Sequence, residues 1–266
     1  MFLSVGMSPV LGARAAPQAA NRWIVQVQPG VSVSDVIGTA QSRWGVVADQ
    51  RFGSVLHGFA IGLTQSQRDA LAADPRVSAV VPDVPVQATG SPYPTTTDEI
   101  QPSVRRVGAT TNVDRPAANL DVDIAVLDTG IQPDNSELNI TGGYDCTDPT
   151  ESEAQRADPA NWADSASFGH GTHVSGIAAA IENGRGMAGV AQGARLWAIK
   201  VLDRNGNGYW SWVICGLDHV AQMRDPNDSA LPRIEAANMS LASAGWDDGD
   251  CGYSNADLLH QAICRL

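Results

Sequence analysis

The sequence predicts an α/β protein in which a parallel sheet, covered on both faces by helices, follows a small α+β unit of ferredoxin-like arrangement. Residues 22–87 alternate strand-like and helical patterns in the order β-α-β-β-α-β, which defines that arrangement. Beyond residue 121, apolar strand-like runs alternate with helical stretches, as in a parallel sheet. The segment between them is rich in Pro, Thr and Ser and predicts an exposed linker.

Each element of the N-terminal unit has a local signal. Ser34 is the expected N-cap of the first helix, and Thr64 with Gln67 has capping-box spacing ahead of the second. The expected elements are strand Arg22–Gln28, helix Ser34–Trp44, strands Val46–Phe52 and Leu56–Leu63, a helix that starts after Thr64 and stops by Asp74, and strand Val77–Val81.

The second unit predicts strands and helices in alternation. The expected strands are Val122–Leu127, Ala194–Leu202 and Ile234–Leu241, and the expected helices are Thr172–Ile181, Ser211–Met223 and one that begins near Ser254. The chain ends at Leu266 inside this last helix, so we expect the sheet to be incomplete at its C-terminal side.

Composition limits the partners. The formal charge is −12 and the pI is about 4.6, which disfavours nucleic acid and anionic membrane surfaces, because both need a concentrated basic face. No apolar run is long enough to predict a membrane span. Met1–Leu11 is apolar and precedes a small-x-small triplet at Ala13, which predicts a signal peptide or its remnant and therefore export. A disordered apolar N-terminus is the alternative.

The four cysteines are even in number, and no CxxC spacing points to zinc. In an exported protein they allow three disulfide pairings. We favour Cys251–Cys264, a short local loop, with Cys146–Cys215 as the second bond. Four buried thiols are the alternative for a cytosolic protein.

Two motifs carry the candidate chemistry. Asp128-Thr129-Gly130 follows a predicted buried strand, and the carboxyl ends of parallel strands are where α/β sheets build their sites. Alone the triplet is ambiguous, because other enzyme classes carry similar signatures and a turn cap would also fit. FGHGTHVSGIAAA is more specific, because the glycines around His170 let backbone and ligand approach the ring. Without an HExxH pattern, His173 is expected to be a supporting core histidine rather than a metal ligand.

Together, VDIAVLDTGI and FGHGTHVSGIAAA resemble the segments that carry the catalytic Asp and His of the subtilisin family of serine proteases (subtilases, peptidase S8). The resemblance places those roles on Asp128 and His170. It covers about residues 102–266 and implies the family's three-layer fold around a parallel sheet. Residues 22–87 resemble the inhibitor-type, I9-like propeptide that precedes such proteases.

The resemblance also implies an organisation and an activity. It assigns a signal peptide or its remnant to residues 1–20, a propeptide to 21–87, a processing linker to 88–101 and the N-terminal part of a peptidase domain to 102–266. The protein would be a secreted endopeptidase precursor that hydrolyses peptide bonds through an Asp-His-Ser triad and needs no cofactor for catalysis. Its partners would be polypeptide substrates and its own propeptide, acting as an intramolecular inhibitor.

In the family, extended substrates pair with two edge segments. The motif match places these segments at Gly206, Asn207, Gly208 and Tyr209, and at Ser240, Leu241 and Ala242. The family usually has glycine at the position of Ala242. The methyl group of Ala242 is therefore expected to narrow the primary specificity pocket.

The family's nucleophile lies in a G-T-S-x-A-x-P segment, and none occurs in these 266 residues. Ser175, Ser240 and Ser243 all lie in other motifs. We therefore expect a truncated precursor that is inactive alone. The alternatives are an inhibitor or intramolecular-chaperone module without catalysis of its own, and a cytosolic α/β ligand-binding protein, which the His motif disfavours.

A structural calcium ion is a weaker implication of the resemblance. Ile181–Met187 matches a calcium-binding loop of the family in length, with Asn183 at a ligand position and Glu137 where a carboxylate ligand is expected. The same loop contains Arg185, and a merely solvated loop is the alternative.

Overall fold

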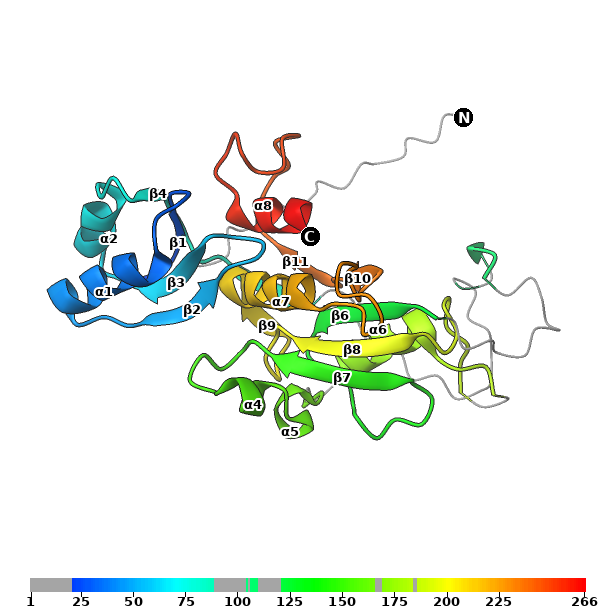
Figure 1. The fold of residues 1–266 in the computed structure, drawn as a ribbon. Coiled ribbons are helices and arrows are strands. Elements are labelled where there is room, and N and C mark those ends of the chain that lie inside the picture. Colours follow the sequence, from blue (N-terminus) through cyan, green and yellow to red (C-terminus); the bar gives the residue numbers. More distant parts are fainter. Residues whose placement is uncertain (1–20, 89–103, 105, 110–120, 166–168, 184–185) are drawn as a thin grey trace, which may run out of the picture.

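The computed structural model describes residues 21–88, 104, 106–109, 121–165, 169–183 and 186–266 (Figure 1). The predicted signal peptide and all but the first residue of the predicted processing linker lie outside these residues. Within the described part, no helix is long and apolar enough to cross a membrane.

The N-terminal unit has the predicted ferredoxin-like order. Its antiparallel sheet has the strand order β2-β3-β1-β4. The elements are β1 (Arg22–Val27), α1 (Val33–Trp44), β2 (Ala48–Phe52), β3 (Gly58–Gly62), α2 (Gln65–Ala72) and β4 (Val77–Pro82). Alternate residues of β1 serve two faces: Val25 and Val27 lie in the unit's own core, whereas Ile24 packs toward the rest of the chain.

The helix caps of this unit are partly as predicted. Thr64 and Gln67 form the predicted capping box at α2. The predicted cap of α1 is wrong: Ser32, not Ser34, is the N-cap, and its hydroxyl accepts from the Asp35 N–H. Either serine can cap a helix, but Ser34 already lies inside the first turn of α1.

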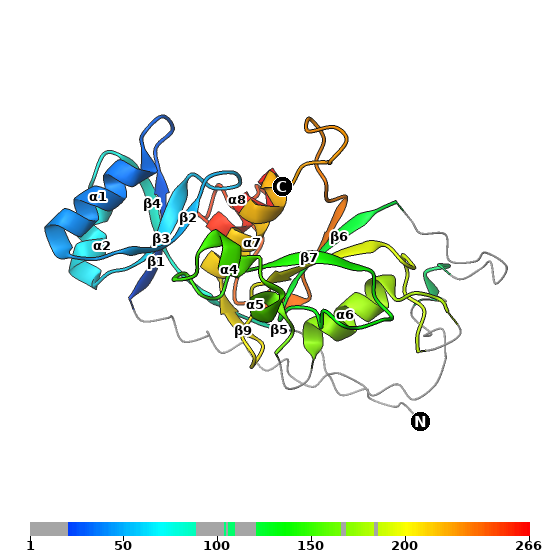
Figure 2. The ribbon, with the colours of Figure 1, turned by 60° about the horizontal axis from the view of Figure 1, so that its bottom comes forward.

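The second unit contains the predicted parallel sheet, with strand order β10-β6-β8-β7. Its strands are β6 (Asp123–Asp128), β7 (Ile140–Asp145), β8 (Arg195–Lys200) and β10 (Ala236–Asn238), and its longer helices are α6 (His170–Ala179), α7 (Trp210–Gln222) and α8 (Leu258–Arg265). Ile124 and Val126 of β6 pack in the cluster that contains α6 residues, whereas Ala125 and Leu127 pack with α7. The sheet therefore has helices on both faces, as the three-layer fold requires (Figure 2).

Three features of this unit differ from the predicted elements. The predicted strand Ile234–Leu241 is two short strands, β10 and β11 (Leu241–Ser243), which belong to different sheets. The helix predicted near Ser254 begins only at Leu258, after a series of turns. Strand β7 and the short helices α4 (Glu153–Arg156) and α5 (Pro159–Trp162) were not predicted.

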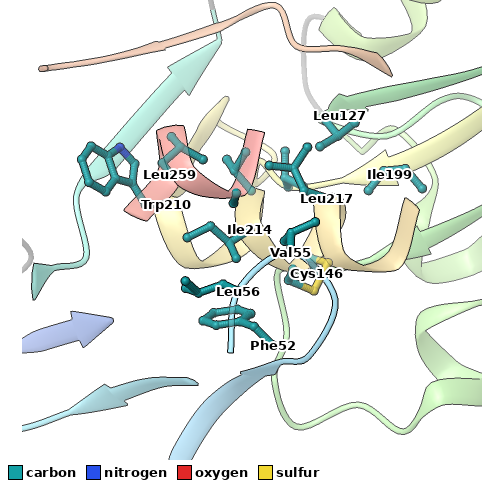
Figure 3. Packing of buried hydrophobic residues seen from close by; sticks show 14 of the residues in the cluster. Phe52, Val55, Leu56, Leu127, Cys146, Ile199, Trp210, Ile214, Leu217 and Leu259 are labelled. Carbon is teal, nitrogen blue, oxygen red and sulfur yellow. A yellow bond between two sulfur atoms is a disulfide. The ribbon is translucent and has the colours of Figure 1, made fainter. Parts of the chain in front are cut away.

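The two units meet in a common hydrophobic cluster, beside the core that the N-terminal unit has of its own. Figure 3 shows Phe52, Val55 and Leu56 of the N-terminal unit packed beside Ile214 of α7 and Leu259 of α8. Polar contacts add to this packing. The carboxylate of Asp218, on α7, accepts from the backbone N–H groups of Gly53, Ser54 and Val55. The sheet of the N-terminal unit is therefore seated on α7 and α8.

Both favoured disulfides are present. Cys146–Cys215 joins the residue after β7 to α7 across 69 positions, and Cys251–Cys264 joins the turns before α8 to that helix across 13 positions. No cysteine of the chain is free. The alternative of four buried thiols is therefore not what the structure contains.

Candidate active site

The Asp128 side chain is placed by a strand that is buried along its whole length. Every residue of β6 is buried, and Asp128 is its last residue, at 0% exposure. In the turn that follows, Gly130 has φ of +105°, and a Cβ there would meet the Trp162 carbonyl oxygen at 2.3 Å. Glycine is therefore required for the chain to leave the strand here.

His170 is placed by the start of α6. It is the first helical residue and is 2% exposed, and Gly169 before it is left-handed with φ of 58°. The next residue, Gly171, explains how the helix comes so close: a Cβ there would lie 2.1 Å from the Gly130 carbonyl oxygen and 3.1 Å from the Asp128 Cβ. The glycines that flank His170 thus allow α6 to pack directly on the Asp128 turn.

The two side chains form a buried pair. His170 Nδ1 lies 2.8 Å from Asp128 Oδ1, which also accepts from the Thr129 N–H at 2.7 Å. Burial raises the pKa of Asp128, and the hydrogen bonds from His170 and Thr129 oppose that rise. A carboxylate that accepts from Nδ1 favours the ring tautomer whose proton is on Nδ1, and in that tautomer Nε2 can act as a base.

A second sheet, of three strands, follows the carboxyl ends of β8 and β10. Its outer strands are β9 (Asn207–Tyr209), which follows β8, and β11, which follows β10, and we call the space between these two strands the groove. Between them runs β5 (Pro85–Ala88) of the N-terminal unit, antiparallel to both. The register pairs Val86 with Gly208 on one side and with Ser243 on the other. The chain thus carries an extended segment seated by β-augmentation.

Five of the seven predicted substrate-binding residues lie in these two outer strands. Asn207, Gly208 and Tyr209 form β9, and Leu241 and Ala242 begin β11. Gly206 accepts the Ala88 N–H through its carbonyl, at 2.8 Å. Ser240 precedes β11, and its hydroxyl accepts from Asn238 Nδ2. Ala242 lies opposite Gln87.

The predicted calcium ligands are neighbours. Asn183 Nδ2 donates to Glu137 Oε2 at 3.2 Å, so the two side chains bond to one another. With the Asn183 amide turned, both would offer oxygen to a cation, and calcium would need several further oxygen ligands. The described residues hold no group of three or more His, Cys, Asp or Glu arranged for a metal ion. The pair would supply two of the oxygen ligands that calcium needs. Arg185 lies outside the described residues.

Two contributors to this site were not predicted. Asp164 accepts from Thr129 Oγ1 and from Thr172, and Lys200 Nζ donates to the Thr129 carbonyl. Neither residue lies in a recognisable motif. A usable signal was present for Lys200, because it is the only lysine of the sequence and stands in the apolar run ARLWAIKVL. A charge buried in a strand needs partners close by.

Comparison with known protein families agrees with both units. The model described as "Subtilase family" matches residues 120–263, which is more than half of the chain. The model described as "Peptidase inhibitor I9" matches residues 23–89.

Curated relatives match either most of the chain or about half of it. An alkaline protease from Alkalihalobacillus alcalophilus is 29% identical over 262 residues, covering 92% of this chain and 64% of that protein. Minor extracellular protease Epr from Bacillus subtilis (strain 168) is 34% identical over 142 residues, 53% of this chain and 17% of the relative. An intracellular serine protease from Paenibacillus polymyxa is 42% identical over 159 residues, 54% of this chain and 46% of the relative. The chain thus spans less than two thirds of the alkaline protease that it matches.

Proposed function

The chain belongs to the subtilase family and carries an I9 propeptide unit, and from this premise we propose that it is the precursor of a secreted serine endopeptidase. In this proposal Asp128 and His170 supply two members of an Asp-His-Ser triad. The observation that carries it is the buried 2.8 Å contact between His170 Nδ1 and Asp128 Oδ1. Its place at the carboxyl edge of the sheet supports the same role.

The proposed chemistry follows from the pair. His170 Nε2 takes the proton of a serine hydroxyl as that oxygen attacks the peptide carbonyl, and returns it to the leaving amine. Asp128 accepts from Nδ1 throughout, holds the tautomer and stabilises the imidazolium while it carries both protons. Extended polypeptides are the substrates, because β9 and β11 offer backbone groups on both sides of a single strand.

We propose that the N-terminal unit is an intramolecular inhibitor. Its segment β5 fills the groove that a substrate would need, and its sheet is seated on α7 and α8 through a common hydrophobic cluster. We place this propeptide at residues 21–87, with processing in the linker at 88–101 and the peptidase domain from residue 102. The same docking would support α7 and α8 during folding.

We further propose that the nucleophile His170 activates is not among the 266 residues. The G-T-S-x-A-x-P segment does not occur in the sequence. Two of the serines near the groove have other partners, which supports this: Ser243 Oγ donates to the Pro85 carbonyl, and Ser240 Oγ accepts from Asn238. The chain alone is then inactive as a peptidase.

The test uses a fluorophosphonate probe, which labels activated serines. The coding sequence is read past the codon for Leu266, and both the 266-residue chain and the product of the whole reading frame are treated. Labelling of the whole product that is lost in His170→Ala supports the proposed protease. Labelling of the 266-residue chain that is lost in His170→Ala would place the nucleophile among these residues. Absence of labelling in both would contradict the protease function.

The second candidate function is an inhibitor or folding module that works without catalysis. The occupied groove favours it, because β5 already binds as a substrate would. A reading frame that stops at Leu266, with inhibition of an added subtilisin, would support the module over the protease.

We propose export from the cell on the strength of the two disulfides, which persist in oxidising compartments. Detection of the disulfide-bonded chain in culture medium tests this, and retention of reduced chain in the cytosol would contradict it.

We also propose that Glu137 and Asn183 contribute ligands to a structural calcium ion, while catalysis needs no cofactor. Their contact and the hard oxygen donors support this. Calcium should raise the Tm of the chain, and Glu137→Gln should abolish that rise, whereas Glu182→Gln in the same loop should not. An equal Tm with calcium and with chelator would contradict the proposal.

A further inference from the structure

A single buried ammonium ties together the segments around the Asp128–His170 pair. Lys200 ends β8, is 5% exposed, and lies opposite Asp128 in the β6–β8 register. Its Nζ donates to the Thr129 carbonyl at 2.8 Å, to the Ala163 carbonyl at 3.3 Å and to Ser165 Oγ at 3.3 Å. Lys200 therefore joins the turn after Asp128 to the loop at residues 163–165.

The charge of Lys200 is balanced from several sides. Burial lowers its pKa, and the carboxylates of Asp145, Asp164 and Asp203 oppose that shift. The nearest acceptors are nevertheless the two carbonyls and the hydroxyl, which are neutral dipoles of the site's own backbone and loop. Burying an ammonium here costs desolvation energy. In this position its hydrogen bonds fix the turn after Asp128 relative to the loop at residues 163–165.

The loop that Lys200 holds carries Asp164, which in turn holds the helix of His170. Asp164 Oδ2 accepts from the N–H of Thr172 at 3.0 Å and from its hydroxyl at 2.7 Å. Thr172 is the third residue of α6, whose N-cap, Gly169, has no side chain to cap it. Asp164 thus supplies the missing N-terminal acceptor from another segment, where the helix dipole favours a negative charge.

Thr129 is the point at which these contacts meet. Its hydroxyl donates to Asp164 Oδ1 at 3.0 Å and accepts from the Gly171 N–H at 2.9 Å, while its carbonyl accepts from Lys200. The residue directly after Asp128 is therefore fixed to the residue directly after His170. Asp164 and Lys200 are the two side chains that complete this connection.

We propose that Asp164 and Lys200 are positioning residues for the Asp128–His170 pair, holding the turn after β6 and the start of α6 at the separation that the Nδ1–Oδ1 hydrogen bond needs. The proposal deepens the proposed function and rests on it for the catalytic meaning of His170. Asp164 and Lys200 act through Thr129, Gly171 and Thr172. A role in stability alone would leave the His170 hydrogen bond unchanged when either side chain is replaced, and this difference makes the proposal testable.

The test follows the His170 ring by ¹H–¹⁵N NMR in the folded 266-residue chain. In Lys200→Met the three hydrogen bonds from Nζ are lost. In Asp164→Asn the side chain keeps a single acceptor oxygen, which can face Thr129 or Thr172 but not both, because the amide nitrogen only donates. We expect the Nδ1 proton of His170 to exchange with solvent about tenfold faster in each variant, as loss of a charge-assisted restraint predicts, and its low-field resonance to move upfield. The control is Asp123→Asn, which removes a buried, hydrogen-bonded carboxylate at the other end of β6. It should lower stability and leave the His170 signal unchanged.

Two milder substitutions at Thr172 keep the test decisive if those variants do not fold. Thr172→Val removes the hydroxyl that bonds Asp164, and Thr172→Ser retains it. Faster exchange in the valine variant with recovery in the serine variant supports the proposal. Folded variants whose His170 signal matches that of the parent chain would overturn it. The measurement follows the Nδ1–Oδ1 bond and needs no nucleophile, so a failure of the proposed protease function would appear in the fluorophosphonate assay instead.

Discussion

Asp83 of the N-terminal unit caps helix α7 of the second unit by accepting twice from Ser211. Asp83 Oδ1 accepts from the Ser211 N–H at 2.9 Å, and Oδ2 accepts from the Ser211 hydroxyl at 2.6 Å. The helix needs this acceptor, because its own N-cap, Tyr209, makes no side-chain cap. The contact lies two residues before β5, so the segment that fills the groove is anchored at its entry.

We expect Asp83→Ala to lower the free energy of unfolding of the chain by about 1–2 kcal/mol, the usual cost of losing an N-cap. Urea denaturation measures it. Asp49→Ala is the matched control, because Arg22 forms ion pairs with both carboxylates, at 3.0 Å to Asp49 and 3.1 Å to Asp83. The control removes a partly exposed ion pair and no cap, so its cost should stay below about 1 kcal/mol. Equal losses in the two variants would show that the ion pair, not the cap, matters.

The glycine after His170 gives a second prediction. Gly171→Ala places a methyl group 2.1 Å from the Gly130 carbonyl oxygen, so α6 must move away from the Asp128 turn. We expect a loss of about 1–3 kcal/mol in unfolding free energy and a weakened His170–Asp128 hydrogen bond, visible as an upfield shift of the Nδ1 proton.

The comparison for this change is Gly38→Ala in helix α1, where a Cβ would meet nothing within 4 Å. Removing glycine from a helix interior stabilises it, so this variant should gain up to about 1 kcal/mol. A Gly171→Ala chain that is as stable as the parent would mean that the helix and turn can separate without cost.

The sequence predicts those parts of the fold in which the local pattern and the tertiary role agree. The apolar runs before Asp128 and Lys200 are central strands, and Thr64 with Gln67 forms the expected capping box. The Asp128 and His170 motifs were recognisable because the glycines beside them are needed for close packing.

Strand β7 was not predicted because the aromatic side chains that pack beside it belong to other segments of the chain. In ITGGYD a Cβ on Gly142 would meet the Trp197 ring at 2.7 Å, and one on Gly143 would meet the Trp162 ring at 2.5 Å. The aromatic rings fill the volume that apolar strand residues would otherwise occupy, so no period-two pattern exists to find. Asp164 was missed for a related reason: a polar loop residue gives no local sign that its partners lie on α6 and after β6.

The two disulfides should differ in their contribution to stability. In the chain-entropy treatment a closed loop of about 14 residues contributes about 3 kcal/mol and one of about 70 residues about 4.4 kcal/mol. We therefore expect Cys251→Ser/Cys264→Ser to cost less than Cys146→Ser/Cys215→Ser, whose cysteines are also buried. Urea denaturation of the two double variants measures the difference, and non-reducing peptide mapping confirms the pairing in the parent chain. A larger loss from the short loop would contradict the ranking.

Asp123 should make the chain sensitive to acid. Burial alone would raise the pKa of Asp123, but hydrogen bonds from Arg195 and Trp197 outweigh it and lower the pKa below 3.8. The unfolded chain then binds this proton more readily than the folded chain, so stability rises with pH through this window. The contribution is complete above the unfolded pKa and is lost as the pH falls through the lowered, folded one.

The stability advantage of the parent chain over Asp123→Asn should therefore be largest near neutral pH and shrink below pH 3.8. Thermal unfolding of the parent chain and of Asp123→Asn across pH measures it. A difference that does not change with pH would mean that the Asp123 carboxylate has the same pKa folded and unfolded.

Under the proposed function, the register of β5 between β9 and β11 predicts where the propeptide is cut from the protease. Strand β5 is paired on both sides, and its last pair joins Ala88 to Leu241. Peptide bonds within Pro85–Ala88 are held in a complete three-stranded arrangement, whereas the chain that follows Ala88 enters the Thr- and Pro-rich linker. In the proposed protease we expect cleavage after Ala88 and before Ile100, close to the Ala88 end, because those bonds are the first beyond the segment that the groove holds. N-terminal sequencing of the mature enzyme identifies the cleavage site.

Ala242→Gly changes the residue opposite Gln87 in the wall of the groove. It should leave the cleavage site in place, since the register is set by the backbone, but alter the rate of cleavage. A mature N-terminus inside residues 22–81, or beyond Val104, would contradict both the propeptide assignment and the binding register.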